Sequence, residues 1–239
     1  MKNLLVAQSG GPTSAINATL AGVVENALSS PSVDRIYGSI NGIQGVLTEN
    51  LIDLKTKITN VSELDLLCQT PASALGSCRV KLKDPAVCAD EYETIISVLR
   101  KYNIDCFIYI GGNDSMDTVD KLSKYLNAKG ITDITVVGAP KTIDNDLCGT
   151  DHCPGFGSAA KYIGTTFAEL ERDCHVYATK AVTIVEVMGR DAGWLTAASC
   201  LARTNGAKGP DFIYLCEVPF SIDTFLKDVK AKLHRNFIG

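Results

Sequence analysis

The chain has 239 residues, 46% of them apolar, and a formal net charge of −4 without any Lys/Arg block, so it can bury a core but is not a general nucleic-acid binder. Its nine cysteines form no CxxC pair, which favours reduced thiols over a disulfide framework or a metal finger. No apolar stretch approaches the roughly 20 residues that cross a bilayer, so we expect a cytoplasmic protein without a membrane segment.

Strand-like and helix-like stretches alternate along most of the chain. Apolar, β-branched runs predict strands at residues 4–7, 35–40, 106–110, 134–138, 181–187 and 212–216. Helical spacing of apolar residues predicts helices at residues 16–28, 89–101, 116–127, 158–172, 192–203 and 222–233. Residues 41–78 are less regular and rich in turn formers. The alternation predicts a mainly parallel sheet with helices on both faces.

A first glycine-rich turn, residues 9–13 (SGGPT), joins the first predicted strand to the first predicted helix. Glycine allows the backbone to approach a phosphate closely, and the helix N-terminus supplies N–H groups with positive partial charge. An ordinary tight turn explains this motif equally well. The turn matches neither GxxxxGK[ST] nor GxGxxG, so the two nucleotide-binding folds with those signatures are disfavoured.

A second glycine-rich turn, residues 111–115 (GGNDS), follows the strand at residues 106–110. Asn113 and Asp114 offer oxygen ligands of the kind that Mg²⁺ prefers and shares with substrate phosphates. Asn or Asp at this place is otherwise an N-cap of the following helix. Because the carboxyl ends of parallel strands share one edge of a sheet, two such turns favour a ligand site there.

The segment at residues 141–146 (KTIDND) follows the next predicted strand and is the most specific local signal. In an extended backbone Asp144 and Asp146 face the same side and share it with Thr142. One carboxylate can accept the proton of an attacking hydroxyl while the other holds a metal or orients its neighbour. Lys141 can neutralise charge on a transferred phosphoryl group. The alternative is an Asp/Asn-rich surface turn.

Two arginines complete the set of candidates. Arg190, between a predicted strand and a predicted helix, suits a bidentate grip on a phosphate or sugar oxygen. Arg79, which ends the segment LGSCR at residues 75–79, has the same chemistry. Each of them alone is equally well explained as a surface arginine. With the glycines, the carboxylates and the lysine, they are the parts of a phosphoryl-transfer site.

These motifs together resemble the blocks of the 6-phosphofructokinase family. The resemblance is carried, in the family's order, by SGG at 9–11, LGSCR at 75–79, GGNDS at 111–115, TIDND at 142–146, PGFGS at 154–158 and MGR at 188–190. It implies a phosphofructokinase-like α/β fold with two doubly wound parallel-sheet domains. Residues 1–155 would bind the phosphoryl donor, and residues 156–239 would form part of the sugar-phosphate domain, whose remainder this chain lacks.

The resemblance also implies the reaction: reversible phosphoryl transfer to the 1-hydroxyl of fructose 6-phosphate in glycolysis, giving fructose 1,6-bisphosphate. It implies Mg²⁺ and a homo-oligomer, a dimer or tetramer, with shared active sites. ATP-using members typically read GGDG and PGT, whereas Asp114 and Lys141 resemble the pyrophosphate-dependent branch. A carboxylate at position 114 would repel the α-phosphate of ATP, at a cost of several kcal/mol in a poorly solvated site. Lys141 would stabilise the leaving phosphate.

Residue roles follow from the same resemblance. Asp144 is the base, with Lys141 and Asp114 as further catalytic residues. Gly11 and Arg79 contact the donor. The sugar phosphate is contacted by Thr142, Ile143, Asp144, Met188, Gly189 and Arg190. Asn113 stands where the family has a metal-associated aspartate, so Mg²⁺ would bind through Asn113, through Asp114 or through water.

Two departures leave other functions open. Family members are typically longer, and their later substrate carboxylate and basic 6-phosphate-binding segment have no counterpart in this chain. The chain is therefore alternatively a fragment of the family, or a non-catalytic assembly or regulatory subunit. A further alternative is an ATP-dependent 6-phosphofructokinase that tolerates Asp114.

Overall fold

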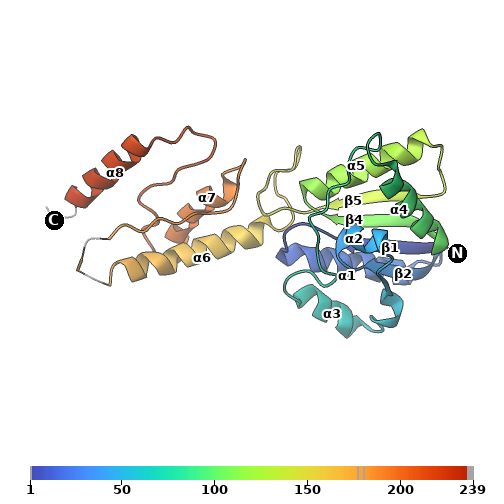
Figure 1. The fold of residues 1–239 in the computed structure, drawn as a ribbon. Coiled ribbons are helices and arrows are strands. Elements are labelled where there is room, and N and C mark those ends of the chain that lie inside the picture. Colours follow the sequence, from blue (N-terminus) through green and yellow to red (C-terminus); the bar gives the residue numbers. More distant parts are fainter. Residues whose placement is uncertain (1, 177, 180, 236–239) are drawn as a thin grey trace. The chain divides into compact units, whose positions relative to one another are not determined.

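The computed structural model describes residues 2–176, 178–179 and 181–235. The chain divides into two compact units, unit 1 (Met1–Thr142) and unit 2 (Ile143–Gly239), which Figure 1 draws in blue to yellow-green and in yellow to red. The division into a donor domain and a sugar-phosphate domain at residue 155 concerns ligand binding and stays a prediction.

Unit 1 is built on a five-stranded sheet with the order β3-β2-β1-β4-β5. The strands are β1 (Lys2–Gln8), β2 (Val33–Ser39), β3 (Leu51–Asp53), β4 (Ile104–Gly111) and β5 (Thr135–Pro140). All pairs are parallel except β3, an edge strand that pairs antiparallel with β2. The mainly parallel sheet and the first four predicted strands are thus confirmed.

Helices cover both faces of this sheet (Figure 1). They are α1 (Ser14–Ser29), α2 (Gly42–Leu47), α3 (Val61–Gln69), α4 (Ala89–Lys101) and α5 (Asn113–Ala128), with a 3-10 turn η1 (Leu54–Thr56). Because successive strand residues point to opposite faces, Leu5 of β1 packs in a core with α2, α4 and α5. Its neighbours Leu4 and Val6 pack in a second core with α1 and α3. Two hydrophobic layers therefore hold the sheet rigid.

The region from residue 41 to residue 78 is more regular than predicted, since it contains α2, β3, η1 and α3. The start of α3 follows a local rule that the sequence displays. The Asn60 side chain accepts a bond from the Glu63 N–H at 3.1 Å, and the Glu63 carboxylate accepts one from the Thr59 N–H at 2.5 Å. This reciprocal N-terminal cap would have predicted the helix.

The regular elements that the structure describes in unit 2 are helices, which irregular segments join. Its elements are α6 (Phe156–Cys174), α7 (Trp194–Ala198), the 3-10 helix η2 (Ser199–Asn205) and α8 (Ile222–Arg235). Helix α6 packs against α7 and η2 through small residues. A Cβ on Gly164 would lie 2.9 Å from the Leu201 Cβ, so glycine sets this close approach. The predicted helices are confirmed, the one at residues 192–203 as a short α-helix followed by a 3-10 helix.

The strands predicted at residues 181–187 and 212–216 are wrong, and no strand occurs among the residues that the structure describes in unit 2. Both runs have the composition of strands, but a strand forms only against a neighbour that satisfies its backbone groups. Val182 and Ile184 instead expose 51% and 74% of their surface. In the described part of the chain, moreover, no helix is long and apolar enough to span a membrane.

Candidate active site

The sheet of unit 1 reverses its strand order between β1 and β4. From β1 the chain runs outward to β2 and β3, and it then returns to β4 on the other side of β1. Ligands of open α/β sheets bind at the carboxyl ends of strands beside such a reversal. The two glycine-rich turns follow β1 and β4, and the lysine follows β5. The predicted gathering of these motifs at one edge is confirmed within unit 1.

The two glycine-rich turns lie against each other. The Ser9 N–H donates to the Ile110 carbonyl at 2.9 Å, and a Cβ on Gly10 would lie 3.5 Å from the Gly112 nitrogen. Gly10 has φ +78°, in the left-handed region that glycine adopts without strain. Helices α1 and α5 begin beside these turns without a side-chain cap. Two helix N-termini with positive partial charge therefore meet at this edge.

The segment at residues 75–79 is tied to the first glycine-rich turn. The Ser77 hydroxyl donates to the Gly10 carbonyl at 2.5 Å, and the Ser9 hydroxyl donates to the Cys78 carbonyl at 3.1 Å. Arg79 follows directly and is exposed. Arg79, the predicted contact to the phosphoryl donor, therefore lies on a segment that is hydrogen-bonded to the first glycine-rich turn. Gly11, in that turn, is also exposed.

A buried polar cluster lies beneath this turn. The Cys78 thiol is 3.7 Å from the Tyr109 hydroxyl and 3.9 Å from that of Ser9. Burial raises the pKa of Cys78, but hydrogen bonds from the Val80 and Gln44 N–H groups and from these hydroxyls outweigh it and hold the pKa below its usual value. Burial also raises the pKa of Tyr109. The cluster is part of the scaffold that supports the turn.

Lys141 connects the two glycine-rich turns. The backbone N–H of Lys141 donates to the Gly111 carbonyl at 2.9 Å, and the side-chain ammonium donates to the Gly11 carbonyl. Only 3% of Lys141 is exposed, and a buried cation costs free energy that must be offset by polar partners. An ammonium held at such a cost beside two glycine-rich turns is suited to receive an anion.

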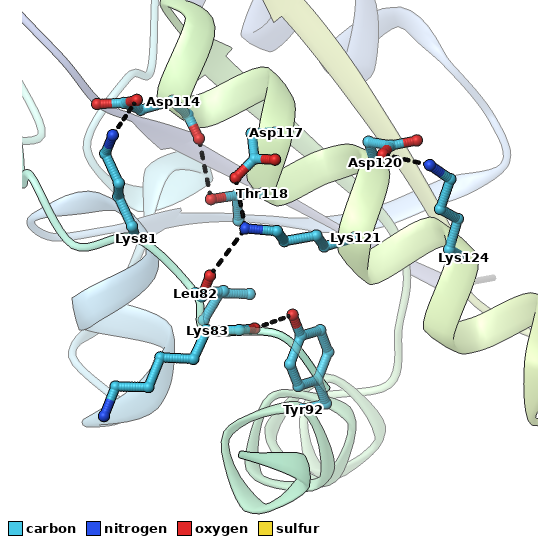
Figure 2. A network of polar contacts seen from close by, with 10 residues as sticks. All are labelled: Lys81, Leu82, Lys83, Tyr92, Asp114, Asp117, Thr118, Asp120, Lys121 and Lys124. Carbon is cyan, nitrogen blue, oxygen red and sulfur yellow. Dashed lines mark hydrogen bonds and ion pairs between the residues drawn. The ribbon is translucent and has the colours of Figure 1, made fainter. Parts of the chain in front are cut away.

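Asp114 lies in the first turn of α5, where Figure 2 shows it facing Lys81. Its Oδ1 atom is 2.7 Å from Lys81 Nζ, and both side chains are about two-thirds exposed. The acid predicted to repel a nucleotide is thus paired with a cation. Sequence reasoning missed Lys81, because a lysine two residues after Arg79 belongs to no motif quoted above.

The same turn carries the candidate metal ligands. Asn113 is exposed beside Asp114, so an amide oxygen and a carboxylate lie next to each other. No group of three His, Cys, Asp or Glu side chains gathers as a metal site in the part of the chain that the structure describes. Since Mg²⁺ commonly takes one or two protein carboxylates plus phosphate oxygens, this donor set fits a metal that a bound phosphate shares.

The TIDND loop runs from Thr142, the last residue of unit 1, into the start of unit 2, and it is not extended throughout. Asn145 has φ +59°, in the left-handed region, so the prediction that Asp144 and Asp146 face one side by alternation is wrong. Asn145 is buried, accepts a bond from the Cys153 N–H at 2.7 Å and donates to the Asp151 carbonyl at 3.1 Å. It therefore fixes the loop that carries both carboxylates, each with one oxygen buried.

Replacing Asn145 with alanine is expected to destabilise the protein by about 1–3 kcal/mol, because one buried and one partly buried hydrogen bond are lost and alanine disfavours a positive φ. Asn145→Gly loses the same bonds but tolerates the conformation, so its loss should be smaller. Denaturant midpoints of the native full-length protein measure both. An unchanged midpoint for Asn145→Ala would contradict the assigned role.

The MGR motif lies in an irregular segment of unit 2 rather than at a strand end. Met188 exposes 67% of its surface. A Cβ on Gly189, which has φ +130°, would lie 2.4 Å from the Ala192 carbonyl oxygen, so the turn needs glycine. The exposed Arg190 donates to Asp191 at 2.9 Å. That these residues meet the cluster of unit 1, as the resemblance implies, stays a prediction.

Comparison with known proteins gives a consistent set of relatives. A family model described as Phosphofructokinase matches residues 3–238. The chain is 44% identical over 235 residues to a pyrophosphate--fructose 6-phosphate 1-phosphotransferase of Xanthomonas campestris, covering 98% of this chain and 55% of that protein. An ATP-dependent 6-phosphofructokinase of Histophilus somni is 32% identical over 98% of this chain and 65% of its own length.

A solved structure agrees with these relatives. The crystal structure of a pyrophosphate-dependent phosphofructokinase from Nitrosospira multiformis superposes with a TM-score of 0.87 at 41% identity, covering 98% of this chain and 58% of that one. The chain spans little more than half the length of the pyrophosphate-dependent relatives that it matches.

Proposed function

This chain belongs to the phosphofructokinase family, and we propose that its protein is a pyrophosphate-dependent 6-phosphofructokinase. The reaction is reversible transfer of a phosphoryl group from pyrophosphate to the 1-hydroxyl of fructose 6-phosphate, which gives fructose 1,6-bisphosphate and phosphate. The observation that carries the proposal is the buried Lys141 ammonium at the Gly11 turn. The higher identity to a pyrophosphate-dependent relative than to an ATP-dependent one supports the donor.

The donor half of the reaction uses residues of unit 1. Pyrophosphate binds at the two glycine-rich turns, where backbone N–H groups and helix N-termini supply positive charge. The Lys141 ammonium neutralises charge that develops on the leaving phosphate, and Arg79 adds a second cation at the edge. Asp114 occupies the position at which the remainder of a nucleoside triphosphate would continue.

The acceptor half uses the TIDND and MGR motifs. Asp144 accepts the proton of the sugar 1-hydroxyl as that oxygen attacks the phosphoryl group. It follows Lys141 by three residues, so their Cα atoms are at most about 11 Å apart. The other contacts to fructose 6-phosphate come from five residues of the two motifs: Thr142, Ile143, Met188, Gly189 and Arg190.

Mg²⁺, a homo-oligomer (dimer or tetramer) and a cytoplasmic location belong to the same proposal. Asn113 would hold the metal, directly or through water, and the metal when bound would neutralise charge on the phosphate oxygens. The nine cysteines are free, which supports a reducing compartment.

The test is a direct comparison of donors with the purified native full-length protein. We expect kcat/KM for fructose 1,6-bisphosphate formation to be about 100-fold or more higher with pyrophosphate than with ATP. A preference for ATP would reject the donor. Failure to bind fructose 6-phosphate, with self-association intact, would instead support the assembly or regulatory subunit.

A further inference from the structure

The ion pair between Lys81 and Asp114 lies on a segment that the proposed function does not yet use. Residues 79–83 (RVKLK) begin at the candidate donor contact Arg79 and contact α5 at Asp114 and Lys121. Figure 2 shows Lys81 reaching up from this segment to Asp114, which belongs to the second glycine-rich turn. The two charged atoms are 2.7 Å apart.

The backbone that carries Lys81 is fixed on its C-terminal side. Leu82 is only 1% exposed, and its carbonyl accepts a bond from the Lys121 ammonium at 3.1 Å. Lys121 is itself paired with Asp117 of the same helix at 2.7 Å. One residue later, the Lys83 carbonyl accepts a bond from the buried Tyr92 hydroxyl at 2.6 Å. Helices α4 and α5 thus hold the segment in place.

Both sides of the pair are therefore built on rigid parts. Upstream of Lys81, the Cys78 carbonyl accepts the Ser9 hydroxyl, which ties the segment to the first glycine-rich turn. Asp114 belongs to α5, and its carbonyl accepts the Thr118 hydroxyl at 3.1 Å. The carboxylate consequently meets Lys81 at the second glycine-rich turn, where both side chains are largely exposed.

The pair is not needed for folding. Its side chains are 64% and 65% exposed, and ion pairs this exposed contribute little to stability. Its charge has a larger consequence for ligand binding, because a carboxylate at the edge of an anion site repels the anion. The Lys81 ammonium cancels that charge and leaves the carboxylate oxygens in place.

We propose that Lys81 is a positioning and specificity-determining residue, which neutralises and orients Asp114 so that the donor site admits an inorganic diphosphate while Asp114 still blocks a nucleotide. This inference rests on the proposed function. Lys81 contacts Asp114 rather than the reacting atoms, so we expect its loss to change donor binding more than the rate of transfer.

The test compares Lys81→Met, which keeps the alkyl stem, with Lys81→Arg, which keeps the charge, in the native full-length protein. We expect Lys81→Met to raise KM for pyrophosphate about tenfold, as an uncompensated unit charge near the donor implies. The same variant should change kcat less than about twofold, and Lys81→Arg should restore most of the affinity. An unchanged KM in Lys81→Met, or a loss confined to kcat, would overturn the inference.

Helix α5 offers a matched control. Lys124 pairs with Asp120 at the same distance, 2.7 Å, with side chains 74% and 56% exposed, and Figure 2 shows this pair further along the helix. Lys124→Met removes an equivalent exposed pair and should leave KM for pyrophosphate within about twofold. An equal rise in KM for both variants would mean that the effect comes from net charge alone and would overturn the role of Lys81.

Two further measurements separate the alternatives. In an Asp114→Asn background, Lys81→Met should change KM less than about twofold, because the charge that Lys81 compensates is gone. Persistence of the full effect would mean that Lys81 contacts the donor directly, which would overturn the inference.

Calorimetric measurement of pyrophosphate binding tests the inference separately from the proposed function. Wild type that binds pyrophosphate but transfers nothing would reject the function, while unaltered binding by Lys81→Met would reject only the inference.

Discussion

Replacing Asp144 with asparagine is expected to lower kcat for pyrophosphate-dependent formation of fructose 1,6-bisphosphate by about 10²–10⁴-fold. Asparagine has nearly the same shape as aspartate, but its amide cannot accept the proton of the sugar hydroxyl. The sugar and the donor keep their other contacts, so KM for each should change little. Initial rates with each substrate varied in turn measure the effect.

The control for this variant lies on the same loop. Asp151 is exposed, and it is its backbone carbonyl that accepts the Asn145 amide. Asp151→Asn should therefore keep kcat within about twofold while making the same chemical change. Denaturant midpoints of both variants show whether the loop is intact. If Asp144→Asn retains more than about a tenth of the wild-type kcat, the base is another group.

The strands and turns of unit 1 can be predicted from the sequence because the pattern that indicates each of them lies within a few consecutive residues. The strands around Leu5 and Phe107 are short apolar runs, and parallel pairing brings their carboxyl ends together whatever the details of packing. The sequence therefore predicts correctly that the glycine-rich turns at Gly10 and Gly112 lie at one edge of the sheet. The capped start of α3 at Asn60 is an equally local signal, although the predicted helices do not include α3.

Other parts of the site depend on contacts that no local pattern encodes. The alternation rule failed between Asp144 and Asp146, since Asn145 takes a left-handed conformation that bonds to Asp151 and Cys153 stabilise. Such residues look like ordinary turn formers in a sequence. The pair of Lys81 with Asp114 joins residues 33 positions apart, and only the folded chain shows that the acid is neutralised.

The strands predicted in unit 2 failed for a different reason. The run that contains Val182, Ile184 and Val185 has the β-branched composition of a buried strand, but all three side chains are exposed. Strand propensity expresses how well side chains pack against neighbouring strands. The composition of this segment correctly indicates a high β-propensity. A strand also needs a neighbouring strand to pair with, and composition does not show whether one is present.

Replacing Lys141 with methionine is expected to lower kcat with pyrophosphate by about 10²–10³-fold. The ammonium that contacts the Gly11 turn is removed, while the alkyl stem that fills the buried space remains. Charge on the leaving phosphate would then develop without its nearest buried cation. The reverse reaction shares the transition state, so its kcat/KM should fall with that of the forward reaction.

Stability distinguishes this catalytic role from a structural one. Lys141→Met removes a buried ammonium whose desolvation costs free energy in the folded protein, so the denaturant midpoint of this variant should stay or rise as activity falls. Lys121→Met is the matched control, because Lys121 bonds to the Leu82 carbonyl away from the glycine-rich turns. It should lose some stability but keep kcat. A Lys141→Met protein that unfolds more easily and transfers phosphate at the wild-type rate would make Lys141 a structural residue, and the donor site would then lack its central cation.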